Sequence, residues 1–131
     1  MKKKVFIGLV VVTVFMIYSF CQIQHSPWVA PEESKSLKNP IEKSDQTTLA
    51  GKKIFEQQCW SCHGKSGNGD GPSARNLKIK PTNFSSPSFQ SQTDGEIFWK
   101  ISEGRGEMAA YKNSLKEENR WQIVNYLKTL K

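Results

Sequence analysis

Residues 59–63 read Cys59-Trp60-Ser61-Cys62-His63, and the interpretation of the whole chain follows from this C-x-x-C-H run. Two thiols separated by two residues can each add to a vinyl group of one haem, and the histidine after them places an imidazole under the iron. The spacing is therefore typical of covalent haem attachment. We expect one haem c, held by Cys59 and Cys62, with His63 as an axial ligand of the iron.

Two other uses of paired cysteines fit the sequence less well. A structural zinc site needs four ligands, and beyond the motif only Cys21 and His25 remain, both far upstream beside an apolar segment. A redox dithiol of the thioredoxin kind lies near a βαβ pattern, which this chain lacks. The haem interpretation is therefore preferred to both.

The N-terminal segment carries lysines at positions 2–4, followed by an uncharged apolar run over residues 5–20. Extended through Ile23, the run gives about 28 Å of helix, which approaches one bilayer crossing. It is longer than an ordinary signal-peptide core, and no A-x-A cleavage site follows it. We therefore predict that residues 1–23 form a signal segment retained as a membrane anchor.

Cys21, at the end of the apolar run, provides an alternative anchor. It would be the acylated cysteine of a lipoprotein, although Phe20 stands where such signals usually carry a small residue. The chain has three cysteines, so haem attachment leaves Cys21 without a disulfide partner. N-terminal lysines favour a cytoplasmic N-terminus. Both alternatives place the remainder at the cell membrane, on its periplasmic or extracytoplasmic side.

Residues 24–44 contain Pro27, Pro31 and Pro40 among polar residues and show no helical or strand period. This composition predicts a linker. His25 lies within it, and could reach a haem only if the linker folded back. Trp28, close to the apolar run, is interpreted as an interfacial anchor or a docking residue. Residues 45–131 then form a single domain of ordinary small size.

The charge balance excludes one class of partner. The formal net charge is +7, but without the lysines at positions 2–4 the chain keeps 16 basic against 12 acidic residues. This small excess of basic residues does not indicate a protein that binds nucleic acid. It can steer the protein toward an acidic patch on a redox partner.

Three helices are predicted in the domain. Gly51 lies inside the first helix, where glycine costs about 1 kcal/mol relative to alanine. Its presence there predicts the close approach of another helix, and the apolar face of the last helix is the expected neighbour. The expected caps and ends are Asp45 or Thr47 for the first helix, Asp94 and Gly104 for the second, and Ser114 or Lys116 for the third, whose apolar side comprises Trp121, Val124, Tyr126, Leu127 and Leu130.

Two stretches between the helices are predicted as loops. Behind the motif, the glycines at positions 64, 67, 69 and 71 form a turn-rich segment that no helix would tolerate. We expect a backbone carbonyl there, that of Pro72, to accept the Nδ1 proton of His63 and hold the ring. The Ser/Thr-rich residues 82–93 are expected to form a surface loop. In the second helix, Trp99 is expected either to reach a haem propionate or to join the core.

With these residues in view, residues 46–131 resemble the class I monohaem cytochrome c family, in its membrane-tethered bacterial type. The attachment motif matches over residues 59–64, Gly51 and Phe55 match the first helix, and Tyr126 and Leu127 match the last. The resemblance implies an all-α cytochrome c fold of about three to four helices around one covalent haem, preceded by the N-terminal apolar helix. It also implies His63 and Met108 as the axial ligands, with Met108 in a Gly-x-Gly-x-Met setting.

One position departs from the family pattern. The family commonly follows the ligand methionine with proline, and Ala109 stands here instead, which is expected to leave the loop less rigid. The alternative is that Met108 is a core methionine beside a pentacoordinate or otherwise ligated haem.

The function that the resemblance implies is one-electron transfer, without a catalytic residue, to and from redox partner proteins such as a respiratory complex or a terminal oxidase or reductase. Two alternatives stay open. In one, Met108 leaves the iron, which then acts as an enzyme on peroxide or nitrogen oxides. In the other, the protein is a fixed cytochrome subunit of a respiratory complex.

Overall fold

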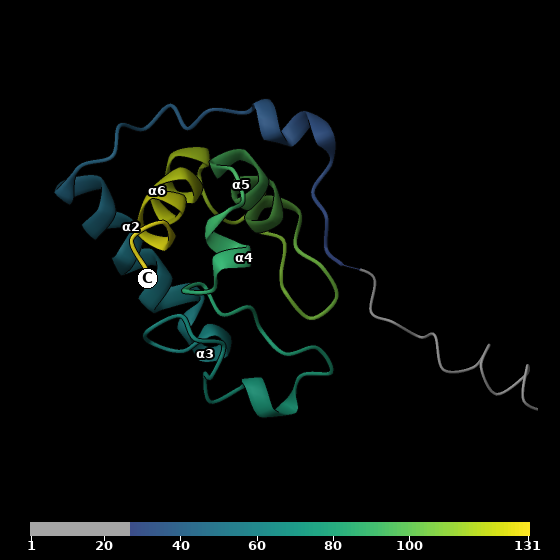
Figure 1. The fold of residues 1–131 in the computed structure, drawn as a ribbon. Helices are drawn as coiled ribbons and strands as arrows, with labels where there is room; N and C mark the ends of the chain where they lie inside the picture. The colour runs from purple at the N-terminus through teal and green to yellow at the C-terminus, as the bar shows by residue number, and fades with distance from the viewer. Residues whose placement is uncertain (1–26) are drawn as a thin grey trace, which may run out of the picture.

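The structure, a computed structural model, describes residues 27–131; the predicted anchor, Cys21 and His25 lie outside the described residues. The regular secondary structure within residues 27–131 is helical, and the β-structure among them is an isolated bridge between Arg105 and Met108. The all-α prediction is confirmed. In chain order the elements are η1 (Glu32–Ser36), α2 (Asp45–Gln58), α3 (Trp60–His63), η2 (Ala74–Asn76), α4 (Pro87–Gln90), α5 (Asp94–Glu103) and α6 (Glu117–Leu127) (Figure 1). None of these helices has the length and apolar character needed to cross a bilayer.

Helix α2 begins with a reciprocal cap. The Ser44 hydroxyl accepts a hydrogen bond from the Thr47 N–H at 3.2 Å, and the Thr47 hydroxyl accepts one from the Ser44 N–H at 3.0 Å. The N-cap is therefore Ser44, and the prediction of Asp45 or Thr47 was wrong. Threonine here takes the part that glutamate or glutamine usually plays in a capping box. The starts of α5 at Asp94 and α6 after Lys116 agree with the sequence.

The crossing of α2 and α6 is the centre of the fold (Figure 1). A Cβ built on Gly51 would overlap the carbonyl oxygen of Gln122, so only glycine lets the two backbones come this close. Next to this contact, Phe55 is fully buried and its ring centre lies 5.3 Å from that of Tyr126. The prediction that Gly51 marks a helix crossing is confirmed.

Helix α5 packs beside α6 through aromatic rings. Phe98 stacks on Trp121 with ring centres 3.8 Å apart. The buried Arg120 guanidinium lies 4.7 Å from the centre of the Phe98 ring and donates to the hydroxyl of Ser102. The remaining core is apolar, with Ile97, Ile101, Ile123, Val124 and Leu127 almost wholly buried.

Residues 27–44, predicted as a linker, pack on the domain, and we call them the N-terminal strap. They contain the 3-10 helix η1 and run past α5 toward the start of α2 (Figure 1). Ser34 is buried, and a Cβ on Gly95 of α5 would overlap its carbonyl oxygen. Five residues of 3-10 helix have no 3.6-residue period, which explains why the sequence showed no element here.

Both ends of the strap are fastened by specific contacts. At the first, the Trp28 ring meets that of Trp99 edge to face at 6.4 Å, so Trp99 has an aromatic partner within the protein. At the second, the Asn39 amide donates to the Asn125 side-chain oxygen at 2.9 Å, and the Asn125 amide donates to the Ile41 carbonyl at 3.3 Å. Asn125 is buried, so this pairing satisfies polar groups that would otherwise be costly to bury.

The predicted surface loop over residues 82–93 is only partly exposed. It contains the short helix α4, and Phe84 and Phe89 are buried in the core. The Gln90 amide donates to the carbonyls of Leu127 and Leu130, at the end of the chain. The surface-loop prediction relied on the Ser/Thr content and gave too little weight to the two phenylalanines, whose side chains pack this segment into the core.

Candidate haem site

The C-x-x-C-H motif lies where α2 ends and the short helix α3 begins. The Cys59 N–H still bonds to the Phe55 carbonyl of α2 at 2.9 Å, and Trp60 to His63 form α3. Cys59 and Cys62 are both free thiols and both half-buried. Burial, with a smaller effect of neighbouring Cys62, raises the pKa of the Cys59 thiol to about 12, so this thiol stays protonated at neutral pH.

The glycine-rich loop after the motif is hydrogen-bonded to the backbone of α3. Backbone N–H groups of Gly69, Gly71 and Ser73 donate to the carbonyls of His63, Cys62 and Ser61, at distances of 2.8 to 3.1 Å. These bonds satisfy carbonyls that the end of a short helix leaves without an intrahelical partner. The loop therefore holds the motif in one conformation.

The His63 ring is held by a backbone carbonyl of another segment. Its Nδ1 donates to the Thr82 carbonyl at 3.3 Å, and Phe84 stacks on the ring with centres 4.4 Å apart. The acceptor is therefore Thr82, and the prediction of Pro72 was wrong. The proton on Nδ1 leaves the Nε2 lone pair free for a metal ion. Burial lowers the pKa of the imidazole, against a smaller opposing effect of the Thr82 bond, which favours the neutral form that ligates.

Met108 lies in a tight hairpin that follows α5. Its backbone N–H and C=O both bond to Arg105, each at 3.0 Å. Gly106, with φ of +58°, occupies the first of the two central positions, where a type II′ turn requires glycine. Ala109 stands where the family has proline, yet the backbone of Met108 is fully paired. These two bonds hold the backbone of Met108 to that of Arg105 with no proline at position 109.

Tyr111 connects the Met108 hairpin to the motif. Its hydroxyl donates to the carbonyl of Gln58, the residue before Cys59, at 3.0 Å. Burial raises the pKa of this phenol, and the nearby Cys59 and Cys62 raise it further. Tyr111 therefore links the segment after Met108 to the end of α2, next to the C-x-x-C-H motif.

The donor groups of the site fit a c-type haem. Two free thiols lie one helical turn apart, beside an imidazole whose Nδ1 is bonded to the Thr82 carbonyl, and Tyr111 brings the methionine-bearing loop to the same region. Within residues 27–131, no three His, Cys, Asp or Glu side chains converge in a way that could hold a metal ion, so this part of the chain offers no zinc cluster. Coordination by the Met108 thioether stays a prediction.

Sequence reasoning missed a second link between loops. The Lys78 N–H donates to the Glu107 carboxylate at 2.8 Å, joining the segment before Thr82 to the Met108 hairpin. The donor is a backbone group, so the identity of residue 78 gives no signal for it. The signal in the sequence for this link was Glu107 itself, an acceptor directly before the candidate ligand Met108.

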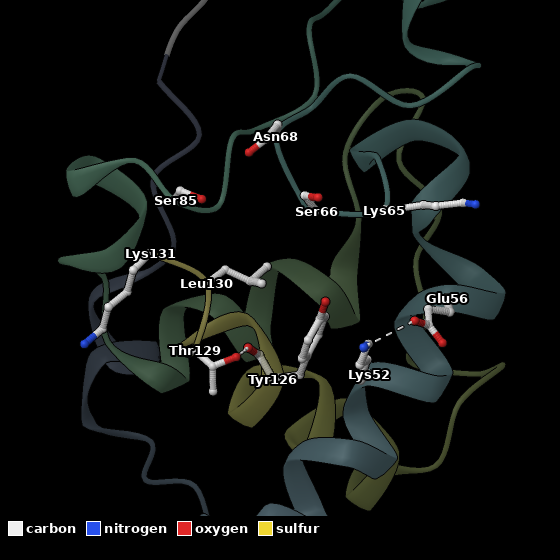
Figure 2. A pocket seen from close by; sticks show the side chains of 10 residues that line it. All are labelled: Lys52, Glu56, Lys65, Ser66, Asn68, Ser85, Tyr126, Thr129, Leu130 and Lys131. Carbon is white, nitrogen blue, oxygen red and sulfur yellow. Dashed lines mark hydrogen bonds and ion pairs between the residues drawn. The ribbon is translucent and has the colours of Figure 1, made fainter.

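A groove of about 670 Å³ opens elsewhere on the surface, and Figure 2 shows Tyr126 directed into it from α6. On one side of the groove, Lys52 pairs with Glu56, one turn further along α2, at 3.8 Å. None of Cys59, Cys62, His63 or Met108 lines this groove, so it is distinct from the haem site. Its lining comprises Lys52, Glu56, Lys65, Ser66, Asn68, Ser85, Tyr126, Thr129, Leu130 and Lys131.

A helical domain whose attachment motif carries two free thiols and an oriented histidine defines a class, that of the c-type haem-binding proteins. Comparison with known families makes this specific: the cytochrome c family model matches residues 49–131, and the chain belongs to the cytochrome c family. Membership implies a covalently bound haem c and a part in electron transfer. No curated protein matches the chain.

Among solved structures, the chain is similar to one from the Kuenenia stuttgartiensis reducing HAO-like protein complex. The two share 31% sequence identity with a TM-score of 0.65, over 72% of this chain and 49% of the other. This chain therefore spans about half the length of that protein.

Proposed function

We propose that this protein is a one-electron carrier that binds a single haem c through Cys59 and Cys62, with His63 and Met108 as axial ligands. The observation that carries the proposal is the hydrogen bond from His63 to the Thr82 carbonyl, because it presents Nε2 as a ligand in a member of the cytochrome c family. When bound, the haem supplies the one-electron change of its iron.

The residues around the site have separable tasks. Cys59 and Cys62 tether the group on a rigid turn, and the Thr82 carbonyl keeps the His63 proton on Nδ1. Phe84, which is buried and stacked on the imidazole, keeps water from that side. With side chains at both axial positions, no coordination position is left for a substrate, which suits a carrier better than an enzyme.

A pyridine haemochrome measurement combined with a redox titration tests this function. We expect one haem per chain, a single one-electron wave, and a low-spin ferric spectrum with the charge-transfer absorption of sulfur ligation. A high-spin resting spectrum together with turnover of peroxide or nitrogen oxides would contradict the carrier and support an enzyme.

A second candidate, a fixed subunit of a redox complex, is favoured by the structural neighbour, since that protein belongs to a reducing HAO-like protein complex. Detergent extraction under mild conditions discriminates the two. A subunit should co-purify with its complex in fixed proportion, whereas a carrier should separate from its partners at moderate salt.

We also propose that the haem domain is held at the extracytoplasmic face of the cell membrane by residues 1–23. The protein should then stay with membranes through high-salt washing and require detergent for release, because about 19 largely apolar residues approach one bilayer span. Cys21→Ser distinguishes the two anchors: a transmembrane helix should survive the change, whereas a lipoprotein should lose its attachment or its processing. Recovery of the unaltered protein in the soluble fraction would contradict both.

A further inference from the structure

Two hydrogen bonds from opposite parts of the haem site converge on one short segment, residues 78–82, which we call the bridging segment. At its end, the Thr82 carbonyl accepts from His63 at 3.3 Å. At its start, the Lys78 N–H donates to the Glu107 carboxylate at 2.8 Å. One segment thus contacts the histidine ligand and the residue adjacent to Met108.

The bridging segment packs against the glycine-rich loop at its C-terminal end. A Cβ on Gly69 would overlap the carbonyl oxygen of Pro81, so the glycine-rich loop packs directly against the segment's backbone. Just beyond it, the Phe84 N–H donates to the Gly67 carbonyl at 2.8 Å. The same loop holds His63 through its carbonyl. The Pro81 and Thr82 end of the segment is therefore fixed, and the exposed Lys78 is joined to it by the short run of chain between them.

The bond to Glu107 also restrains Met108, the next residue in the hairpin. The two are adjacent in the hairpin, where Arg105 binds both backbone groups of Met108. Because these bonds make the hairpin one unit, a carboxylate that holds Glu107 in place also limits the movement of Met108. A hydrogen bond to a charged acceptor is stronger than one between neutral groups.

We infer that Glu107 is a positioning residue: its carboxylate, bonded to the Lys78 N–H, holds the Met108 hairpin against the bridging segment and so keeps the thioether on the iron. The inference rests on the proposed His63/Met108 ligation. It assigns to Glu107 part of the rigidity that the family's proline supplies and that Ala109 cannot.

Imidazole binding to the ferric holo-protein tests the inference, because imidazole must displace Met108. Glu107→Ala should bind imidazole about fivefold more tightly than the unaltered protein, since the methionine-off state becomes more populated. Glu107→Gln, which keeps an acceptor oxygen without the charge, should fall between them. Glu42→Ala is the matched control: it removes an exposed carboxylate from the strap, where the Glu42 backbone, not its side chain, accepts from Thr47. It should bind imidazole as the unaltered protein does.

A double-mutant cycle identifies the bond responsible. Lys78→Pro removes the N–H donor, and the extended conformation of Leu77 suits a residue before proline. Lys78→Ala removes only the ammonium group and should leave imidazole binding unchanged. In the Lys78→Pro background, Glu107→Ala should add no further effect. Should Lys78→Pro fail to fold, the three glutamate variants still decide the matter.

Two results would overturn the inference: unchanged imidazole affinity in Glu107→Ala, or a full Glu107→Ala effect that persists in Lys78→Pro. Both are measured in a protein that shows the charge-transfer band of methionine ligation. If the unaltered ferric protein lacks that band, the proposed His63/Met108 ligation fails instead, so the two failures are distinguishable.

Discussion

Met108→Ala is expected to abolish the charge-transfer absorption of the ferric protein while Cys59 and Cys62 keep the haem attached. Without the thioether the iron gains an open position, so azide and cyanide should bind roughly tenfold more tightly or better, because no internal ligand competes. The potential should fall by on the order of 100 mV, within the range that axial ligands control. Absorption spectra, ligand titrations and redox titrations measure all three effects.

Met108→His serves as the matched variant. A second imidazole should restore six-coordination and exclude azide, but at a lower potential than methionine gives. An unaltered spectrum in Met108→Ala would show that the sixth ligand lies elsewhere. His25, outside the described residues, would then be the next position to replace.

Gly51→Leu is expected to destabilise the holo-protein by about 3 kcal/mol, at the upper end of the cost of overpacking. The reason is geometric, because even the Cβ would overlap the backbone carbonyl of Gln122, and a backbone cannot rotate away as a side chain can. The melting temperature should drop by about 10 °C or more for a domain of this size. Thermal unfolding followed by circular dichroism measures the change.

Lys53→Leu is the control for Gly51→Leu, since it adds a leucine to an exposed position of the same helix. It should change the melting temperature by only a few degrees. Equal stability of the two variants would show that α2 and α6 do not need their close contact, and the fold assignment would lose its main support.

Features encoded in residue type and spacing were predictable from the sequence. The C-x-x-C-H motif is contiguous, so its three candidate haem-binding side chains could be named without knowledge of the fold. Gly51 was informative because glycine inside a helix lowers stability relative to alanine, which predicted that another helix approaches closely there. The start of α5 at Asp94 was predicted, although the N-cap is Thr93, which bonds with Glu96 across the first turn and had been assigned to the preceding loop.

Features that depend on backbone groups were not predictable in the same way. The partner of His63 is a carbonyl, which every residue carries, so choosing Thr82 over Pro72 required knowledge of the loop path. The same holds for the Lys78 N–H that Glu107 binds. The strap was missed for a related reason, since its contact with α5 depends on the absence of a side chain at Gly95, far along the chain.

The docked strap also limits how far the haem domain can travel. If residues 27–44 were a free coil, they would add a root-mean-square span of about 23 Å between the domain and residue 26. With Trp28 packed on Trp99 and Asn39 bonded to Asn125, that span is not available. If the proposed anchor at residues 1–23 holds the protein at the membrane, the distance that the domain can reach from it does not include a free coil over residues 27–44. With that anchor, the domain would reach only partners close to its attachment point, and a partner held there would meet it at a high local concentration.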